Sequence, residues 1–161
     1  MRCPGCGLGA EGDAAAACLA LYHELSTHTL SDRDPTFKHQ LAVDAYAAQH
    51  AGPTSRSLTI AFALIGLHLV FERGFTGYQA QHAHMFLGRR KQEWPRFAPP
   101  DDRGAVTVAD VVAAGETERD GAIRRWAASV WSAWHEQHER IAELVRDRFD
   151  RHGGQPGRPG R

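Results

Sequence analysis

The fold of this protein is decided by Ser55-Arg-Ser-Leu-Thr-Ile-Ala-Phe-Ala-Leu-Ile-Gly-Leu-His-Leu-Val-Phe-Glu-Arg73. Its large apolar side chains face nearly every side of a helical wheel, and they are Leu58, Ile60, Phe62, Leu64, Ile65, Leu67, Leu69 and Phe71. A helix that is apolar all round must be covered on most sides. The sequence therefore predicts that 55–73 is the central helix. Its apolar run, broken by Gly66 and His68, is too short to span a bilayer.

Two helices are predicted on the amino-terminal side of this stretch. Residues 14–28 carry apolar side chains at helical spacing, and the Gly-rich residues before them place the start near Ala15. Asp34 followed by Pro35 indicates a helix start, because aspartate accepts hydrogen bonds at the N-cap and the next position needs no N–H donor. The second helix is therefore predicted from Pro35 to about His50, where a Gly-Pro pair stops it.

Three helices are predicted on the carboxyl-terminal side. Thr76 with Gln79, and Thr107 with Asp110, have the spacing of residues that cap helix starts. The predicted ranges are 76–90, 107–114 and 116–151. No segment sustains the period-two alternation of a strand, although 105–108 could pair briefly. The sequence thus predicts an all-α bundle of four or five principal helices.

Length and charge limit the possible domain organisation and the classes of partner. The 161 residues suit one helical domain, 1–152, whose first part, 1–14, is a lead that contains cysteine. Residues 153–161 are rich in Pro, Gly and Arg, and they are predicted to be disordered. Nineteen basic and nineteen acidic side chains give zero net charge, so we expect neither nucleic acid nor membrane as a partner. The amino terminus lacks the pattern of a secretory signal, so we expect a cytoplasmic location.

The three cysteines lie early in the chain, Cys3 and Cys6 in a C-x2-C turn and Cys18 in the first predicted helix. Such a turn lets two thiolates bind one Zn²⁺, and a third cysteine leaves a tetrahedral shell one ligand short. In a reducing compartment an odd number of cysteines favours metal ligation or redox chemistry over disulfides. Two alternatives stay open. The turn could hold free thiols beside a core Cys18, or it could be a redox dithiol, although the nearby glycines disfavour that context.

One of the ten histidines is expected to complete the shell. The first two predicted helices should run antiparallel. Residues that lie opposite each other in the pair should then have residue numbers that add up to about 63. On that register His50 lies about five residues, or roughly 7.5 Å, from the level of Cys18, and His39 lies about six residues the other way. We therefore rank His50 first and His39 second. Asp44 or Gln49 is expected to accept the second N–H of the ligating imidazole.

Several enzyme motifs fail on context or spacing. Gly7-Leu-Gly-Ala-Glu-Gly12 matches the letters of a dinucleotide fingerprint, but no strand precedes it. His135-Glu-Gln-His138 is one residue short of the metalloprotease motif. The sequence contains neither the E-x-x-H pairs of di-iron bundles nor the G-x-S-x-G of serine hydrolases. These enzyme classes therefore lose support.

Polar residues predicted on apolar helix surfaces are the candidates for chemistry. They could converge on an acid/base pocket or a second metal site, because a carboxylate beside an imidazole tunes its pKa toward the working pH. Alternatively, each is a core or capping residue satisfied by hydrogen bonds. The candidates are His39, Asp44, His68, Glu72 and His84. The loop 94–100, with Trp94, Phe97 and Pro99, is the candidate binding surface.

Six stretches carry a family resemblance. They are Cys3-Pro-Gly-Cys6, Cys18-Leu-Ala-Leu-Tyr22, His39-Gln-Leu-Ala-Val-Asp-Ala-Tyr-Ala-Ala-Gln-His50, Glu72-Arg-Gly-Phe75, Trp94-Pro-Arg-Phe97 and Gly104-Ala-Val-Thr-Val-Ala-Asp-Val111. Together they resemble the bacterial DUF5946 family of uncharacterised proteins over nearly the whole chain except the tail. The resemblance implies a bacterial, cytoplasmic protein with no assigned activity. It supplies no catalytic residues.

The prediction from sequence is a helical protein in which three cysteines and His50 hold a structural Zn²⁺ that fastens the lead to the first two helices. Two functions stay open. In the first, the protein is a binding or interaction module whose groove at 94–100 receives a protein or a small ligand. In the second, it is a metal-assisted hydrolase or transferase that uses the His/Asp/Glu pocket inside the bundle. Whether the protein is an enzyme is left undecided.

Overall fold

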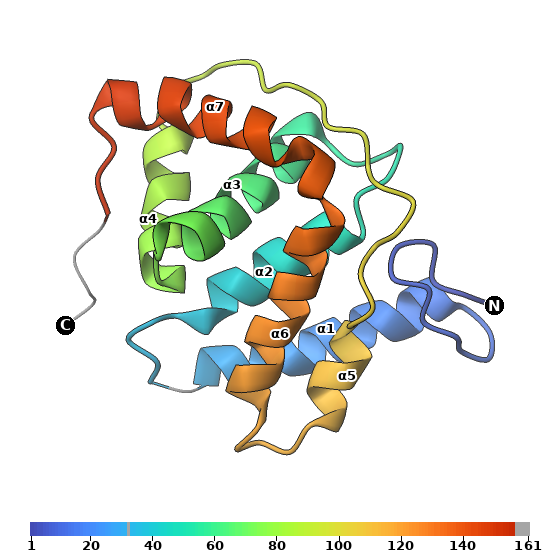
Figure 1. The fold of residues 1–161 in the computed structure, drawn as a ribbon. Coiled ribbons are helices and arrows are strands. Elements are labelled where there is room, and N and C mark those ends of the chain that lie inside the picture. Colours follow the sequence, from blue (N-terminus) through green and yellow to red (C-terminus); the bar gives the residue numbers. More distant parts are fainter. Residues whose placement is uncertain (32, 157–161) are drawn as a thin grey trace.

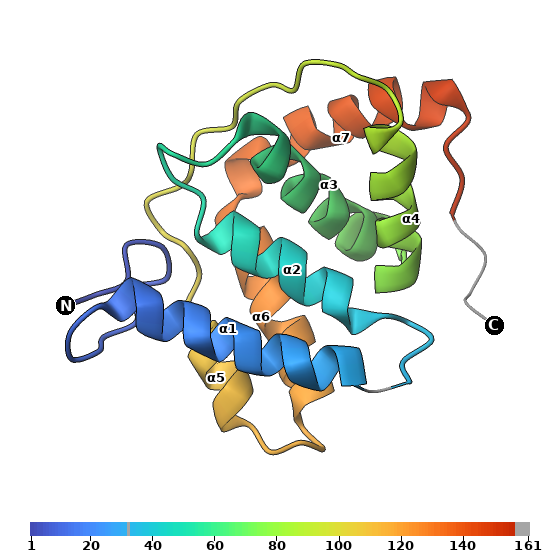
Figure 2. The same ribbon diagram turned by 180° about the vertical axis from the view of Figure 1, so that it is seen from behind.

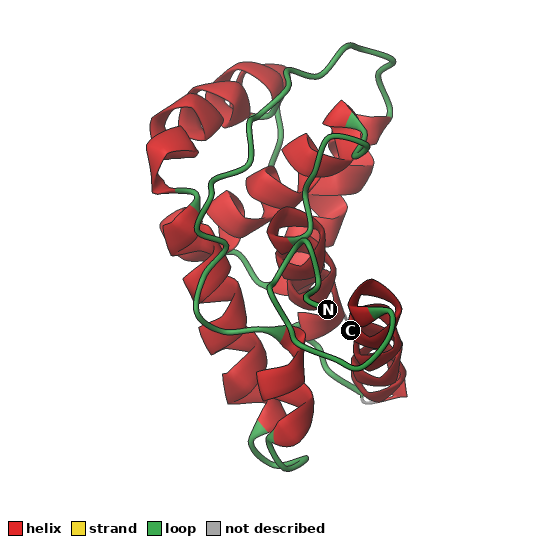
Figure 3. Ribbon diagram, turned by 90° about the vertical axis from the view of Figure 1, so that its right-hand side faces the viewer, coloured by secondary structure: helices red, strands yellow, loops and turns green. Residues whose placement is uncertain are grey.

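The computed structural model describes residues 1–31 and 33–156, and within them every regular element is a helix (Figure 1). The elements in chain order are α1 (Ala14–Ser31), α2 (Lys38–Gln49), α3 (Ser57–Arg73), α4 (Gly77–Gly88), α5 (Val108–Ala113), α6 (Arg119–Ala133), η1 (His135–Gln137), α7 (His138–Arg148) and η2 (Asp150–His152). The all-α prediction is confirmed. The described residues form seven α-helices rather than the four or five predicted, joined by loops (Figure 3).

The predicted central helix is confirmed as α3. Every residue from Ala63 to Val70 is buried, and α3 packs against α2, α4, α6 and α7. Gly74, with φ of 68°, ends α3 in the left-handed conformation that glycine adopts without strain. The predicted capping box of Thr76 and Gln79 then starts α4. The observed ends of α3 and α4 therefore lie within a few residues of the ends that these local signals predicted.

Helix α2 also lies inside the bundle. It packs against α1, α3, α4 and α6, and viewed from behind it runs beside α1 (Figure 2). Its innermost apolar residues, Ala42, Ala45 and Ala48, are fully buried. Because alanine side chains are small, neighbouring helices can approach α2 closely on several sides. The last turn of this helix positions the candidate site.

The predicted start of α2 at Pro35 is wrong, because the helix begins at Lys38. The Asp34 carboxylate accepts the backbone N–H groups of Thr36, at 2.9 Å, and of Lys38, at 3.0 Å. Asp34 therefore caps a turn that precedes the helix. Phe37 follows that turn with φ of 51°, a left-handed conformation that interrupts helical geometry before Lys38.

The predicted single helix over 116–151 is also wrong. It would be about 54 Å long if straight, far longer than the core it has to cover. The chain instead bends at His135–Gln137, between α6 and α7 (Figure 1). At the bend the Trp134 ring is buried and its N–H donates to the Ala48 carbonyl, while the His138 ring stacks on Trp131 at 3.7 Å. The bend lets α6 pack on α2 and α7 pack on α3.

The remaining predictions concern short segments. The residues 105–108 do not pair as a strand, and the isolated β-bridge among the described residues joins Arg2 to Gly9. Of the predicted disordered tail, 157–161 lie outside the described residues, and Gly154 is buried with its N–H donating to the Phe149 carbonyl. None of the helices in residues 1–31 and 33–156 has the length and apolarity that a bilayer crossing requires.

Candidate metal centre

The amino-terminal lead folds back on itself around its two cysteines. The Cys3 N–H donates to the Leu8 carbonyl at 2.8 Å, and the Gly7 N–H donates to the Cys3 carbonyl at 2.9 Å. Gly7 closes the turn with φ of 76°. Burial raises the pKa of the Cys3 thiol, but hydrogen bonds from the Cys6 and Gly5 N–H groups outweigh it and lower that pKa overall. The turn thus presents Cys3 as a sulfur prepared to carry negative charge.

The lead rests directly on the histidine that ends α2. A Cβ atom built on Gly5 would overlap the Cδ2 atom of His50 and lie 2.8 Å from its Cγ atom. Glycine is therefore required at position 5 for the turn to approach the imidazole ring. This contact brings the C-x2-C turn to the end of α2.

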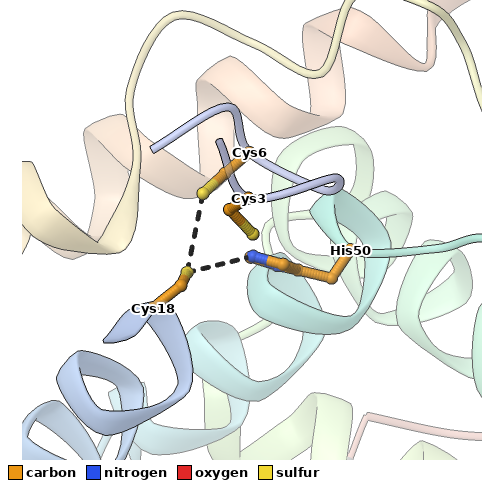
Figure 4. Close-up of side chains that lie close together, drawn as sticks. All are labelled: Cys3, Cys6, Cys18 and His50. Carbon is orange, nitrogen blue, oxygen red and sulfur yellow. Dashed lines mark hydrogen bonds between the residues drawn. The ribbon is translucent and has the colours of Figure 1, made fainter. Parts of the chain in front are cut away.

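Four side chains from three segments meet at this point (Figure 4). We call them the Cys/His cluster, and its members are Cys3, Cys6, Cys18 and His50. Their sulfur atoms and one imidazole nitrogen all lie within 4.8 Å of one another. The Cys18 sulfur, fully buried on α1, lies 3.5 Å from the Cys6 sulfur and 3.2 Å from His50 Nε2. The structure thus brings together the four residues predicted to share a metal.

The spacing suits a tetrahedral ion. Bonds of about 2.3 Å to sulfur and about 2.0 Å to nitrogen would place two ligating sulfurs about 3.8 Å apart and a sulfur and a nitrogen about 3.5 Å apart. The two contacts of Cys18, at 3.5 Å and 3.2 Å, are within a few tenths of an ångström of those values. The four residues could therefore hold one metal ion.

The His50 ring is oriented by the backbone of its own helix. Its Nδ1 atom lies 2.8 Å from the Tyr46 carbonyl, which can only accept, so Nδ1 donates and Nε2 presents its lone pair to the cluster. The Tyr46 ring stacks on the imidazole at 3.9 Å. Burial lowers the pKa of His50 and the nearby Arg103 charge lowers it too, although the hydrogen bond to Tyr46 opposes the shift, so the neutral ring that a metal needs is favoured.

The predicted orienting residues have other partners. Asp44 accepts a hydrogen bond from Gln40, and Gln49 bonds to Trp126 and to the 103–106 segment. The prediction that Asp44 or Gln49 holds the imidazole is therefore wrong. The sequence signal that would have found the Tyr46 carbonyl is the spacing of four residues between Tyr46 and His50, which are neighbours on one helix face. That carbonyl accepts both the His50 ring N–H and the His50 backbone N–H, the latter at 3.0 Å.

The second-ranked ligand, His39, lies outside the cluster. Its Nδ1 atom is 2.9 Å from the Thr29 hydroxyl, and its ring packs against Phe37 at 5.5 Å. Both contacts are near the other end of the α1/α2 pair, as the antiparallel register predicts. Burial lowers the pKa of His39, which favours a neutral core side chain.

A network that sequence reasoning missed secures the chain beside the cluster. The fully buried Gln49 amide donates to the Arg103 carbonyl at 3.0 Å and the Val106 carbonyl at 2.8 Å, and it accepts the Trp126 indole N–H at 2.9 Å. In return the Arg103 guanidinium donates to the carbonyls of Gln49 and Ala51. The end of α2 thus holds the 103–106 segment with one residue, Gln49, and faces the cysteines with the next, His50.

A cavity of about 840 Å³ lies between the lead and this segment. The turn 3–7 lines one side, and residues 98–104 line the other, together with Arg2, Gly52, Pro53 and Arg96. The predicted aromatic surface at 94–100 is wrong in part, because Phe97 is fully buried and Trp94 packs edge-on against Phe62. Of the three residues named for that surface, Pro99 alone lines the cavity.

The five residues predicted to converge on a pocket lie in three separate places, and none of them lines this cavity. His39 bonds to Thr29. Asp44 faces His84, with 3.8 Å between Asp44 Oδ2 and His84 Nε2. These contacts give no shared acid/base site.

The other two candidates meet a tryptophan on α6. Glu72 accepts the Trp131 indole N–H at 2.8 Å, and His68 packs edge-on against the same ring at 6.1 Å. His68 Nδ1 is buried and has no hydrogen-bond partner among the described residues. The predicted single His/Asp/Glu pocket is therefore wrong.

Asp44 allows a prediction about pH. Burial raises the pKa of this carboxyl well above its ordinary 3.8, although the hydrogen bond from Gln40 opposes the shift. The groups facing it are His84, whose pKa burial lowers to about 4, and Tyr22, whose pKa burial raises. The unfolded chain releases the Asp44 proton at lower pH than the native state does, so Asp44 costs stability increasingly as pH rises above 3.8 toward the native pKa.

The variant Asp44→Asn cannot ionise and escapes this cost. We expect its stability relative to the parent to improve between about pH 5 and about pH 8. Urea unfolding of both proteins at the two pH values measures the difference. A relative stability that stays the same at the two pH values would contradict the raised pKa and show that Asp44 is already ionised at about pH 5 in the native state.

The comparisons with known proteins give one result. A family model described as a family of unknown function, DUF5946, matches residues 1–135. No curated protein and no solved structure matches the chain. The matched range includes the whole Cys/His cluster and the cavity beside it.

Proposed function

The chain belongs to DUF5946, a family of unknown function, and we propose that it is a binding module organised by a structural Zn²⁺ in the Cys/His cluster. One observation carries this proposal. Four donor atoms from the lead, α1 and the end of α2 lie within 4.8 Å of one another. Three thiols and one imidazole are a donor set of structural zinc sites.

The donor set favours zinc and a structural role. Thiolates select soft or borderline ions, and three thiolates with one imidazole make a tetrahedral shell that suits Zn²⁺. Such a shell is complete, so it leaves no open position for a substrate or a reactive water. A reducing, cytoplasmic compartment would keep the thiols available to the ion.

The ion would add metal–ligand bonds to the apolar packing that already places Cys3, Leu8 and Ala10 against the core. The backbone hydrogen bonds of residues 1–10 join the lead to itself, as in Cys3 to Leu8 and Ala10 to Met1. Bonds from Cys18 and His50 to a shared ion would fasten the lead to α1 and α2. They would also set the position of the 3–7 turn, which is one wall of the cavity.

Binding in this module belongs to the 840 Å³ cavity, whose volume suits a small ligand or a short chain segment. Its other wall is secured independently through Gln49 and Arg103. The alternative of a metal-assisted hydrolase or transferase has no comparable support, since its five candidate residues do not share a site.

Elemental analysis of the purified full chain tests the metal proposal. We expect one equivalent of zinc in the parent protein and background levels in Cys18→Ser and His50→Ala, because each variant removes a ligand from a four-ligand shell. His39→Ala is the matched control, since it removes a histidine of the same helix that lies outside the cluster. It should retain the full equivalent.

Two results would overturn the site. One is a full equivalent of zinc in the double variant Cys3→Ser/Cys6→Ser, and the other is loss of zinc in His39→Ala but not in His50→Ala. Substitution with cobalt gives a second readout, because tetrahedral and octahedral Co²⁺ differ in visible absorption. We expect the tetrahedral spectrum in the parent chain and not in Cys18→Ser.

A further inference from the structure

Cys6 differs from the other two cysteines in its exposure. Cys3 is 3% exposed and Cys18 is fully buried, whereas Cys6 is only half-buried. Both cysteines of the turn line the 840 Å³ cavity, which is open to solvent. A small reagent in that cavity therefore meets Cys6 before it meets Cys18.

A second thiol stands behind Cys6. The Cys6 and Cys18 sulfurs are 3.5 Å apart, so a movement of about 1.5 Å would bring them to disulfide bonding distance. Within the described chain the backbone hydrogen bonds of residues 1–10 are internal to the lead, so a shift of Cys6 toward α1 would break none to the helices, although Leu8 and Ala10 pack against the core. The Cys3 sulfur also contacts the Cys6 and Cys18 thiols, but it accepts the N–H groups of Cys6 and Gly5, and at 3% exposed it is less accessible than Cys6.

We propose that Cys6 is an oxidation site, where a hydroperoxide entering through the cavity produces a Cys6–Cys18 disulfide and ends metal binding. This inference rests on the proposed function, because ligation by a metal keeps the thiolates deprotonated and nucleophilic. It assigns the reactive thiol and the resolving thiol to different segments of the chain, the lead and α1.

The two steps balance. The Cys6 thiolate attacks one peroxide oxygen, the O–O bond breaks, and Cys6 becomes a sulfenic acid as hydroxide leaves. The Cys18 thiolate then attacks the Cys6 sulfur, the S–S bond forms and a second hydroxide leaves. Two thiolates are oxidised by two electrons and one peroxide is reduced. The cluster then retains two donors, Cys3 and His50, which are too few for a stable tetrahedral site.

The disulfide would leave the lead attached to the bundle. It replaces a bond through the ion with a covalent bond between the lead and α1. The oxidised protein is therefore expected to release zinc while keeping its helical content. A reductant should restore both thiols and zinc binding, since a disulfide is reversible whereas a sulfinic acid is not.

The experiment treats the full, zinc-loaded chain with hydrogen peroxide and follows zinc release with a chromogenic chelator. We expect one equivalent of zinc to be released for each peroxide consumed, unchanged helical circular dichroism, and recovery with a phosphine reductant. Peptide mass spectrometry should find residues 6 and 18 joined, with the loss of two hydrogen atoms. Zinc that stays bound, a Cys3–Cys6 or Cys3–Cys18 bond, or a sulfinic acid at Cys6 would overturn the proposal.

Two variants control the result. Met85 is 57% exposed and would also be oxidised, so Met85→Leu should release zinc as the parent does. Cys3→Ser keeps the proposed pair and should still form the Cys6–Cys18 bond, even without metal when the thiolates are generated at alkaline pH.

Zinc content measured before peroxide is added separates the failure of the proposed function from the failure of the disulfide proposal. A chain that holds no zinc contradicts the proposed function, while the pairing found in Cys3→Ser still decides the disulfide.

Discussion

Replacing Gly66 with alanine should destabilise the protein by about 3 kcal/mol or more. Gly66 is buried in the middle of α3, where a Cβ atom would overlap Asp44 Oδ2 and lie 2.6 Å from Asp44 Cγ and 3.1 Å from His84 Nε2. Asp44 cannot move aside without losing its hydrogen bond from Gln40, at 3.1 Å. The gain of roughly 0.5 to 1 kcal/mol that alanine normally brings to a helix is too small to offset this overlap.

Gly121→Ala is the matched control for this prediction. Gly121 lies in the first turn of α6, and its added Cβ would meet only the flexible end of Arg125, at 3.2 Å. That variant should be as stable as the parent or up to about 1 kcal/mol more stable. Urea unfolding of the parent and both variants gives the free energies.

A double-mutant cycle then identifies the cause. In an Asp44→Ala background the overlapping oxygen is gone, so Gly66→Ala should cost about 1 kcal/mol or less. An equal cost in both backgrounds would mean that the overlap with Asp44 does not explain the effect.

Gln49→Leu should cost about 3 to 5 kcal/mol, although leucine nearly matches glutamine in size. The Gln49 amide is fully buried, and its three hydrogen bonds go to the Arg103 carbonyl, the Val106 carbonyl and the Trp126 N–H. Leucine leaves all three groups without that partner. Each buried group that stays unpaired costs about 1 to 3 kcal/mol, and rearrangement of the 103–106 segment would recover part of the total.

Gln92→Leu is the control, because it removes an amide that also bonds to a carbonyl and a side chain, but in a half-buried position that water can reach. Its partners can turn to water, so we expect a change below about 1 kcal/mol. The single variant Trp126→Phe removes one of the three bonds of Gln49 and should give an intermediate value. A Gln49→Leu variant no less stable than Gln92→Leu would contradict the role assigned to this amide.

Much of the fold could be predicted because its signals are local. The apolar pattern of 55–73 predicted the central helix, and the capping boxes at Thr76 and Thr107 predicted the starts of α4 and α5. Each signal depends on residues within one or two turns of one another. The position of Asp34 before Pro35 was misleading for the same reason, since the same carboxylate can cap a turn as well as a helix.

The bend after Trp134 could not be predicted, because no Pro or Gly marks it. Its cause is distant in the chain: the Trp134 N–H reaches the Ala48 carbonyl on α2, and α7 has to turn to cover α3. The burial of α2 inside the bundle could not be predicted either, for a related reason. Its buried surface is made of alanines and satisfied amides, which carry little hydrophobic signal in the sequence.

The candidate site, too, has a part that could be predicted from neighbouring segments and a part that could not. The proximity of Cys18 and His50 followed from an antiparallel register, which is a property of two neighbouring helices and a short loop. The convergence of His39, Asp44, His68, Glu72 and His84 required three helices, α2, α3 and α4, to turn particular faces toward one point, and they do not. Helical spacing shows on which face of its own helix a residue lies. It does not show which other segment packs against that face.

By itself the sequence determined most of the helices, the central place of α3 and the four residues that could share a metal, because spacing, capping and a single hairpin act between near neighbours. Tertiary structure alone decided which polar groups meet across the bundle: Tyr46 orienting His50, Gln49 holding the 103–106 segment, and Gly66 making room for Asp44. Such contacts depend on distances between segments far apart in the chain. Those distances are set only when all the helices pack together.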